Sequence, residues 1–171
     1  YFRVKEMLIG TRDVFEYFEC NNCKTIQIRD FPGNISEFYP LGYYSFQIPK
    51  QKTNPMICFL IRTAKKKLIK YHAGNLNFTG FILSALYKNP FPWMTKEMTN
   101  FNARFLDVGS GAGKLLLSME RSGFKNLTGI DPYIEHNIEY PGRVKILKND
   151  LREISGIYDF IMFHHSFEHM D

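Results

Sequence analysis

The spacing of apolar residues changes character near residue 100 of this chain. Before that point, apolar residues recur at helical spacing in two segments, which predicts helices at 57–71 and 79–88. Beyond it, short strands are predicted at 103–108, 126–130, 144–147 and 158–163, and a helix is predicted at 112–121. Strands that alternate with helices pair in parallel through right-handed crossovers. The predicted fold class is therefore α/β.

The first 48 residues show a different pattern, with short strands and an aromatic loop. Strands are predicted at 15–18 and 25–28, on either side of Cys20-Asn-Asn-Cys23, which is the arrangement of a zinc knuckle on a hairpin. Tetrahedral zinc needs four ligands, so Cys20 and Cys23 form half of a site. Residues 31–46 are rich in Pro, Gly and Tyr and predict an ordered loop. We divide the chain into a hairpin and aromatic loop (1–48), a helical linker region (49–100) and an α/β domain (101–171).

The net charge of +5 is unevenly distributed along the chain. The first 100 residues hold 14 Lys and Arg against 7 Asp and Glu, whereas residues 101–171 hold 8 against 10. Much of the excess lies on the predicted helix 57–71, at Arg62, Lys65, Lys66, Lys67 and Lys70. The interpretation that we favour is that these cations form a solvated helix face. The alternative is a patch for anionic lipid headgroups, nucleic acid or a phosphorylated substrate.

The composition argues against a disulfide-rich protein and against a membrane-spanning one. Three cysteines are too few for a disulfide framework, and the longest apolar runs are shorter than the roughly 20 residues that a bilayer span needs. No basic segment followed by an apolar one opens the sequence. We expect a soluble protein in the cytoplasm, without a transmembrane segment, and its oligomeric state is left open.

The strongest chemical signal is the sequence Phe105-Leu-Asp-Val-Gly-Ser-Gly-Ala-Gly-Lys114, where a buried strand runs into a glycine-rich turn and a helix. Glycines let the backbone approach a ligand closely. A dinucleotide fold has the spacing Gly-x-Gly-x-x-Gly, which would require glycine where this chain has Lys114. A phosphate-binding Walker loop is also excluded, because Leu115 follows Lys114 in place of Ser or Thr. Without a pyrophosphate, Asp107 is free to face a cationic or amino-bearing ligand.

This segment resembles the Asp-x-Gly-x-Gly-x-Gly signature of class I S-adenosylmethionine-dependent methyltransferases, whose fold is a Rossmann-like sheet. The resemblance implies that Asp131, after the second strand, accepts both ribose hydroxyls, and that Asp150 accepts from the adenine amine. It places Leu151 against the adenine ring and His164 beside the methionine moiety. The implied cofactor-binding residues are Asp107, Gly109, Ser110, Gly111, Gly113, Asp131, Pro132, Asp150, Leu151 and His164. A complete sheet of this family has three more strands, so we expect an incomplete sheet at the carboxyl end.

The segment Phe18-Glu-Cys-Asn-Asn-Cys23 and the aromatic stretch that ends at Tyr43-Tyr44 resemble the N-terminal region of bacterial methyltransferases with a small zinc-ribbon-like module. Such proteins are often encoded among polysaccharide and glycolipid biosynthesis genes. In them an earlier Cys-x-x-Cys completes the metal site, and this sequence has no such second pair. The resemblance therefore implies zinc at Cys20 and Cys23 as a half-site.

Three further residues with acid, base or metal chemistry follow the fourth strand. Their spacing predicts that His165, Glu168 and His169 share one face of a helix beside the methyl-donor pocket. His165 and His169 are candidates for the general base or for contact with the substrate. Some O-methyltransferases resemble this arrangement with Glu-x-x-Glu-His and hold a divalent ion there. This chain differs by having His165 in place of the first acid.

A neutral hydroxyl gains most from a neighbouring base during methyl transfer, so the histidines favour O-methylation of a saccharide, glycolipid or other small hydroxyl acceptor. Two alternatives stay open. The basic first part and the half zinc knuckle are also consistent with an RNA methyltransferase, although we favour nucleic acid less as a partner. The chain would also be consistent with a non-catalytic scaffold that keeps the cofactor fold.

Overall fold

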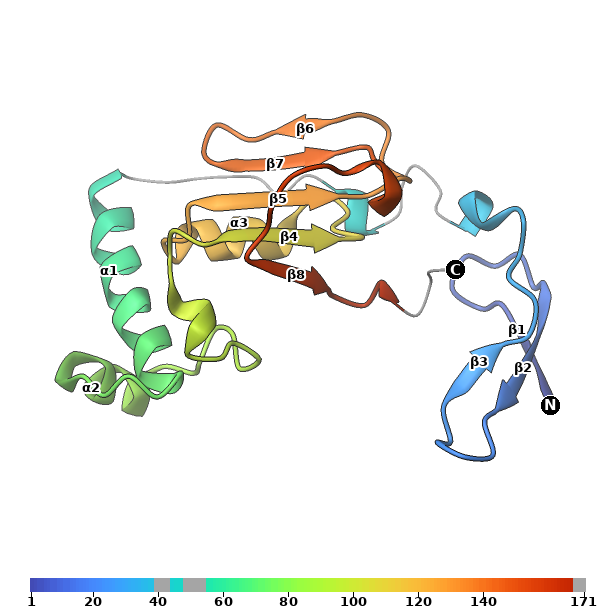
Figure 1. Cartoon of the computed structure of the whole chain (residues 1–171), viewed down its shortest axis with the longest axis horizontal. Coiled ribbons are helices and arrows are strands. Elements are labelled where there is room, and N and C mark those ends of the chain that lie inside the picture. Colours follow the sequence, from blue (N-terminus) through green and yellow to red (C-terminus); the bar gives the residue numbers. More distant parts are fainter. Residues whose placement is uncertain (39–43, 48–54, 168–171) are drawn as a thin grey trace. The chain divides into compact units, whose positions relative to one another are not determined.

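The computed structural model describes residues 1–38, 44–47 and 55–167. The chain forms two compact units, one up to residue 40 and one from residue 41 to residue 170, and each is described by itself (Figure 1). In the described residues, no helix is both long enough and apolar enough to cross a membrane.

The first unit is a three-stranded antiparallel sheet of β1 (Phe2–Lys5), β2 (Val14–Glu19) and β3 (Ile26–Ile28), in that order, followed by a short 3-10 helix, η1 (Ile35–Phe38). The predicted hairpin around the cysteines is β2 and β3. The first strand was missed, because Phe2-Arg-Val-Lys is short and all four residues are exposed. In the loop after β1, the Glu6 carboxylate accepts three backbone N–H groups, which lower its pKa to about 2.

The second unit contains a five-stranded sheet with the order β6-β7-β5-β4-β8. Its strands are β4 (Arg104–Val108), β5 (Asn126–Ile130), β6 (Ile138–Glu139), β7 (Val144–Leu147) and β8 (Phe160–Phe163). All neighbours pair in parallel except β6 with β7. The α/β prediction is confirmed, and the predicted strands 126–130 and 144–147 match β5 and β7 residue for residue. The short edge strand β6 was not predicted.

The direction of the chain reverses at the middle of this sheet. After β4 the chain moves outward through β5 to β7, and it then returns to place β8 on the other side of β4. Ligands of open α/β sheets bind beyond the carboxyl ends of the strands at such a switch point. The topology therefore predicts a ligand site at the carboxyl end of β4.

Two helices form a hairpin near the amino ends of β4 and β5, and a third covers the sheet (Figure 1). They are α1 (Pro55–His72), α2 (Phe78–Leu86) and α3 (Lys114–Arg121). The side chain of Asn77 caps α2 by accepting the N–H of Gly80 at 2.7 Å. Gly80 is buried against α1, where a Cβ would lie 2.5 Å from the Cβ of Tyr71. A further 3-10 helix, η3 (Glu97–Thr99), precedes the sheet.

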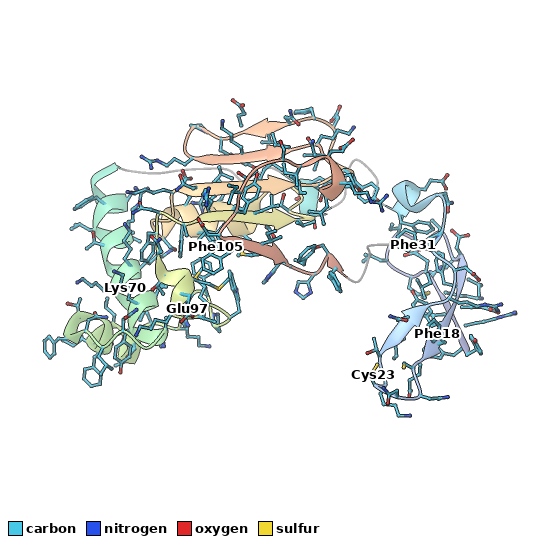
Figure 2. All side chains as sticks on the ribbon, in the orientation of Figure 1. Phe18, Cys23, Phe31, Lys70, Glu97 and Phe105 are labelled. Carbon is cyan, nitrogen blue, oxygen red and sulfur yellow. The ribbon has the colours of Figure 1, made fainter. Side chains whose placement is uncertain are left out.

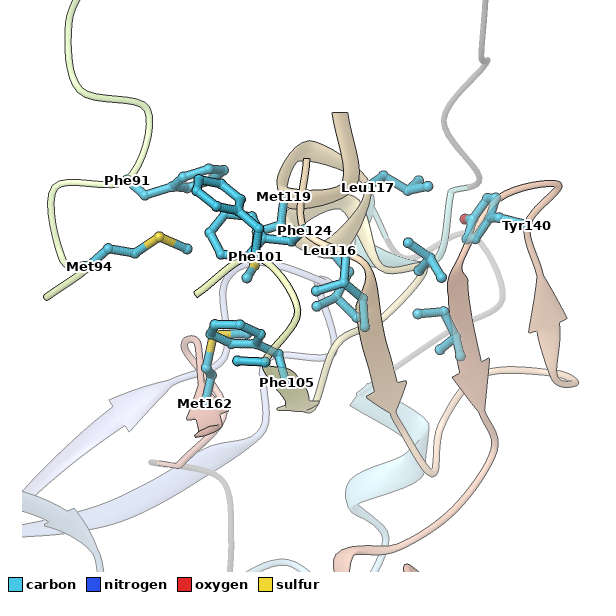
Figure 3. Close-up of a cluster of buried hydrophobic side chains, with 14 of the residues drawn as sticks. Phe91, Met94, Phe101, Phe105, Leu116, Leu117, Met119, Phe124, Tyr140 and Met162 are labelled. Carbon is cyan, nitrogen blue, oxygen red and sulfur yellow. The ribbon is translucent and has the colours of Figure 1, made fainter. Parts of the chain in front are cut away.

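Aromatic rings fill much of the space between α3 and the sheet (Figure 3). Phe124 lies at the centre, with its ring centroid 4.5 Å from that of Phe101 and 5.3 Å from that of Phe105. Leu116 and Met119 of α3 are fully buried in the same cluster. This core fixes α3 on the sheet and thereby fixes the turn that precedes the helix.

Candidate cofactor site

The glycine-rich turn joins β4 to α3 at the switch point of the sheet. Gly109, Gly111 and Gly113 have φ angles of 74°, 53° and 73°, in the left-handed region that favours glycine. The helix begins at Lys114, two residues later than predicted, because Ala112 and Gly113 still belong to the turn. Each glycine of the motif is thus required by the local backbone conformation.

The backbone N–H groups of this turn already donate to protein acceptors. Gly109 and Ser110 donate to the Ile130 carbonyl at 2.8 and 3.1 Å, and Gly113 donates to the Ser110 carbonyl at 2.9 Å. Gly111 donates to Asp131 Oδ2 at 2.9 Å. Ala112 donates to the Ser45 carbonyl at 2.8 Å. A dinucleotide cradle needs such amides to point at a pyrophosphate, so this hydrogen bonding agrees with the exclusion of a dinucleotide site.

Two segments distant in sequence pack directly on the turn. A Cβ at Gly109 would lie 2.4 Å from Ser166 Cβ, and one at Gly111 would lie 2.7 Å from the Ser45 carbonyl oxygen. The Ser166 hydroxyl also donates to the carbonyl of Val108. Ser45 lies in η2 (Tyr44–Phe46), within the predicted aromatic loop, of which residues 39–43 lie outside the described residues. Sequence reasoning missed both contacts, because they join segments that are distant in sequence and leave no pattern along the chain.

Asp131 lies directly after β5 and is buried. Its Oδ2 accepts the Gly111 N–H, and its Oδ1 accepts the Tyr133 N–H at 2.9 Å. Burial raises the pKa of Asp131, and these two N–H groups act in the opposite direction. The carboxylate therefore holds the glycine turn in place, a role that its position after a strand did not reveal. Each oxygen keeps a further lone pair for a second donor.

Asp107 is the second buried carboxylate of the site. Burial, and then the neighbouring charge of Asp131, raise the pKa of Asp107 to about 7. Its Oδ1 is buried and has no hydrogen-bond partner among the described residues. A buried polar atom without a partner is costly, and such atoms cluster at functional sites. Asp107 is therefore poised to accept a hydrogen bond from a bound molecule.

Asp150 follows β7 and caps the 3-10 helix η4 (Leu151–Glu153). It accepts the Arg152 N–H at 2.9 Å, and its own N–H donates to Glu153 Oε2 at 2.9 Å, which completes a capping box. Leu151 packs against the buried cluster of Leu106, Val108 and Ile130. The contact of Asp150 and Leu151 with an adenine stays a prediction, as does the place of Pro132, which is exposed after Asp131.

His164 and His165 follow β8 directly and are exposed. The ring centroid of His164 lies 5.8 Å from that of Trp93 and 5.3 Å from that of His165. His165 has a φ of 56° in a bend, so the expectation that it lies on a helix face is wrong. The left-handed backbone arises where the chain turns to bring Ser166 onto Gly109. Glu168 and His169 lie outside the described residues.

The two cysteines of the first unit lie at the tip of the β2–β3 hairpin. Cys23 Sγ donates to Thr25 Oγ1 at 3.2 Å, and this bond, together with the Thr25 backbone and the Cys20 thiol, lowers the pKa of Cys23. The thiols of Cys20 and Cys23 thus lie close enough to interact. Within the described ranges, no group of three or more His, Cys, Asp or Glu residues is placed to hold a metal ion. Zinc at Cys20 and Cys23 stays a prediction.

Together, the parallel sheet, the left-handed glycine turn and the two buried acids define a class I S-adenosylmethionine-dependent methyltransferase domain. The profile of a family described as "Methyltransferase domain" matches residues 82–171, which is just over half of the chain. The chain belongs to this family, and the fold and enzyme class predicted from the sequence are confirmed.

Two relatives share shorter segments with the chain, and both are named EEF1A lysine methyltransferase 2. The protein from Danio rerio is 49% identical over 39 residues, which cover 23% of this chain and 17% of the relative. The protein from Homo sapiens is 37% identical over 70 residues, which cover 40% of this chain and 29% of the relative. The chain therefore spans less than a third of either relative. No solved structure matches the chain.

The residues at the carboxyl ends of β4 and β5 fit the cofactor of this family. S-adenosylmethionine carries an amino group and a ribose diol, both of which donate hydrogen bonds. The partnerless oxygen of Asp107 and the remaining lone pairs of Asp131 are acceptors in a buried setting. When bound, this cofactor supplies an electrophilic methyl group on its sulfonium.

Gly129 provides a test of the packing beneath the turn. A Cβ at this position would lie 2.4 Å from Ser110 Oγ and 2.7 Å from Ile146 Cδ1. We expect Gly129→Ala to lower the free energy of unfolding by about 1–3 kcal/mol through overpacking, as measured by chemical denaturation. Adding Ser110→Ala removes the nearest atom but leaves Ser110 Cβ 2.8 Å away, so the double variant should recover part of the loss. A Gly129→Ala variant of unchanged stability would contradict this packing.

Proposed function

We propose that this domain transfers a methyl group from S-adenosylmethionine to a hydroxyl of a saccharide, glycolipid or similar small acceptor. The observation that carries the proposal is the pair of exposed histidines directly after β8, at the same sheet edge as Asp107 and the glycine turn. A neutral hydroxyl must lose its proton during the displacement, and histidine is the side chain whose ordinary pKa suits that task near neutrality.

In this proposal the chain's own groups have separate tasks. Asp131 and Asp107 bind and orient the cofactor, and the packing of Ser166 against Gly109 fixes the start of the segment that follows β8. His165 accepts the acceptor's proton. His164, whose ring lies beside Trp93, contributes to the wall near the methionine moiety. His169 remains a second candidate base from the sequence.

A lysine amine of a protein is the second candidate acceptor, and the names of the two relatives favour it. A lysine ammonium also must lose a proton before it attacks, so the same histidines would serve. The two candidates differ in the atom that carries the methyl group afterwards. Incubation with labelled S-adenosylmethionine and either a glycan mixture or a protein extract, followed by mass spectrometry of the products, identifies methylated oxygen or methylated lysine. Label found in neither class would contradict both candidates.

The histidines provide a kinetic prediction. We expect His165→Ala to lower kcat by about 10²–10⁴-fold, the usual contribution of a general base, and to leave the affinity for S-adenosylhomocysteine unchanged. His164→Ala, unlike His165→Ala, should weaken cofactor binding, because His164 is assigned to the methionine moiety. The comparison uses initial rates and calorimetry on the same preparations. A His165→Ala variant with wild-type kcat over a range of pH would exclude this residue as the base.

A further inference from the structure

A long stretch of this chain carries no acidic residue. Between Glu37 and Glu97 there is no Asp or Glu, while nine Lys and Arg are present. The stretch includes both helices of the α1–α2 hairpin. Charge of one sign over so long a stretch favours a partner of the opposite sign.

Part of this charge surrounds a pocket at the hairpin, away from the glycine turn. The pocket has a volume of about 490 Å³, and its lining includes Lys67, Lys70 and Lys96. Glu97 is the one carboxylate among its lining residues, and the Thr95 side chain hydrogen-bonds to it and lowers its pKa. Lys70, in the last turn of α1, and Glu97 are both labelled in Figure 2, on the same side of the unit. In the described part of the chain, none of the three lysine ammonium groups takes part in an ion pair.

Further cations gather on the same side of α1. The Lys66 ammonium lies 4.9 Å from the centroid of the Phe101 ring, and that of Lys70 lies 5.9 Å from it. Burial, followed by repulsion from Lys125, Arg62 and Lys70, lowers the pKa of Lys66. Among the described residues, neither Lys66 nor Lys70 forms an ion pair with a carboxylate.

The lysine pocket ends at Asn77, which caps α2, and α2 presents an apolar face that the described structure leaves exposed. Phe78, Ile82 and Leu86 follow one another at intervals of four residues, so they share one side of the helix. Phe78 is 79% exposed and Leu86 is 72% exposed. Gly80, on the opposite side of the helix, is buried against α1. Leu76, which is 89% exposed, lines the lysine pocket and precedes Phe78 by two residues in the sequence.

We propose that the exposed face of α2, together with the lysine pocket at the amino-terminal end of this helix, is a docking surface for a membrane that contains anionic phospholipid. An apolar helix face flanked by lysines is the arrangement of helices that lie in the membrane interface, with the apolar side chains among the acyl chains and the ammonium groups at the phosphates. Aliphatic residues such as Ile82 and Leu86 do not stack on bases, which favours lipid over RNA.

The test measures binding of the whole protein to vesicles by sedimentation. We expect binding to vesicles of phosphatidylcholine mixed with phosphatidylglycerol and little binding to phosphatidylcholine alone. Raising the ionic strength from about 0.1 M to 1 M should weaken binding strongly, because the screening length falls from about 10 Å to 3 Å. Equal binding to both kinds of vesicle would show that the lysines do not recognise anionic phospholipid and would overturn the proposal.

Two double variants separate the two parts of the surface. Lys67→Glu with Lys96→Glu, and Phe78→Ser with Leu86→Ser, should each weaken vesicle binding by roughly tenfold or more. The matched control is Arg143→Glu with Lys145→Glu, which makes the same charge change at exposed positions around β7 and should have no such effect. All variants change exposed side chains and should keep the wild-type affinity for S-adenosylhomocysteine, which confirms folding independently of the methyl acceptor.

Other occupants give distinct results. If the lysine variant loses binding to RNA or to polyphosphate while the Phe78 and Leu86 variant keeps it, the surface recognises phosphate without a membrane and the proposal is wrong. If the protein forms a dimer in solution that the Phe78 and Leu86 variant abolishes, and neither form binds vesicles, the face belongs to a second copy of this chain. Vesicle binding unaffected by both double variants would also overturn the proposal.

Discussion

Replacing Asp131 with alanine should weaken the binding of S-adenosylhomocysteine by ~100-fold or more. The reason is that the variant lacks both oxygens that are assigned to the ribose hydroxyls, and each charge-assisted hydrogen bond contributes about 1.5–3 kcal/mol. A loss of 1.4 kcal/mol is about tenfold in affinity. The same variant removes the acceptors of the Gly111 and Tyr133 N–H groups, so the glycine turn also loses its support. Calorimetry with S-adenosylhomocysteine measures the effect.

A control separates lost affinity from lost stability. Asp159 pairs with Arg104 at 2.9 Å at the amino end of β8, the sheet edge opposite the glycine turn. Asp159→Ala should lower the melting temperature slightly and leave S-adenosylhomocysteine affinity unchanged. If the Asp131→Ala variant is folded at the temperature of the measurement and binds with wild-type affinity, the assignment of Asp131 to the ribose is wrong.

Replacing Asp107 with asparagine should stabilise the protein at alkaline pH while it weakens cofactor binding. The folded pKa of Asp107 is raised from 3.8 to about 7, so between these values the folded state binds more protons than the unfolded state. The free energy of unfolding of the wild type therefore falls as pH rises through this window, by up to roughly 4 kcal/mol for this group. Asparagine does not titrate, so the variant should lack this part of the pH dependence. Chemical denaturation at pH 4.5 and pH 8 measures it.

The cofactor affinity of the same variant completes this prediction. An ionised Asp107 attracts the amino group of S-adenosylhomocysteine, and its protonated form does not. Wild-type affinity should therefore decrease below pH 7, by up to about tenfold per pH unit, and the Asp107→Asn variant should have a lower affinity with little dependence on pH. A variant that gains stability at pH 8 and keeps wild-type affinity would show that Asp107 is a buried group without a role in binding.

The sequence by itself determined the class of this protein and most of its second unit. The strands 126–130 and 144–147 were predicted without error, because each is a short segment in which apolar residues are interrupted by polar residues or glycine and which turn residues bound, a signal that is local. The Asp-x-Gly-x-Gly-x-Gly motif was equally informative, since left-handed backbone at three positions of one turn requires glycine, and few folds need that turn. The hairpin of β2 and β3 was visible for the same local reason.

The tertiary structure alone decided how the site is held together. The Ser45 carbonyl on the Ala112 N–H and the Asp131 carboxylate on the Gly111 N–H join segments that are 67 and 20 residues apart. The raised pKa of Asp107 depends on every atom that excludes water around it, and the bend at His165 depends on the contact of Ser166 with Gly109. Backbone acceptors and desolvation leave no pattern along a chain, because they arise only when distant segments are packed against one another.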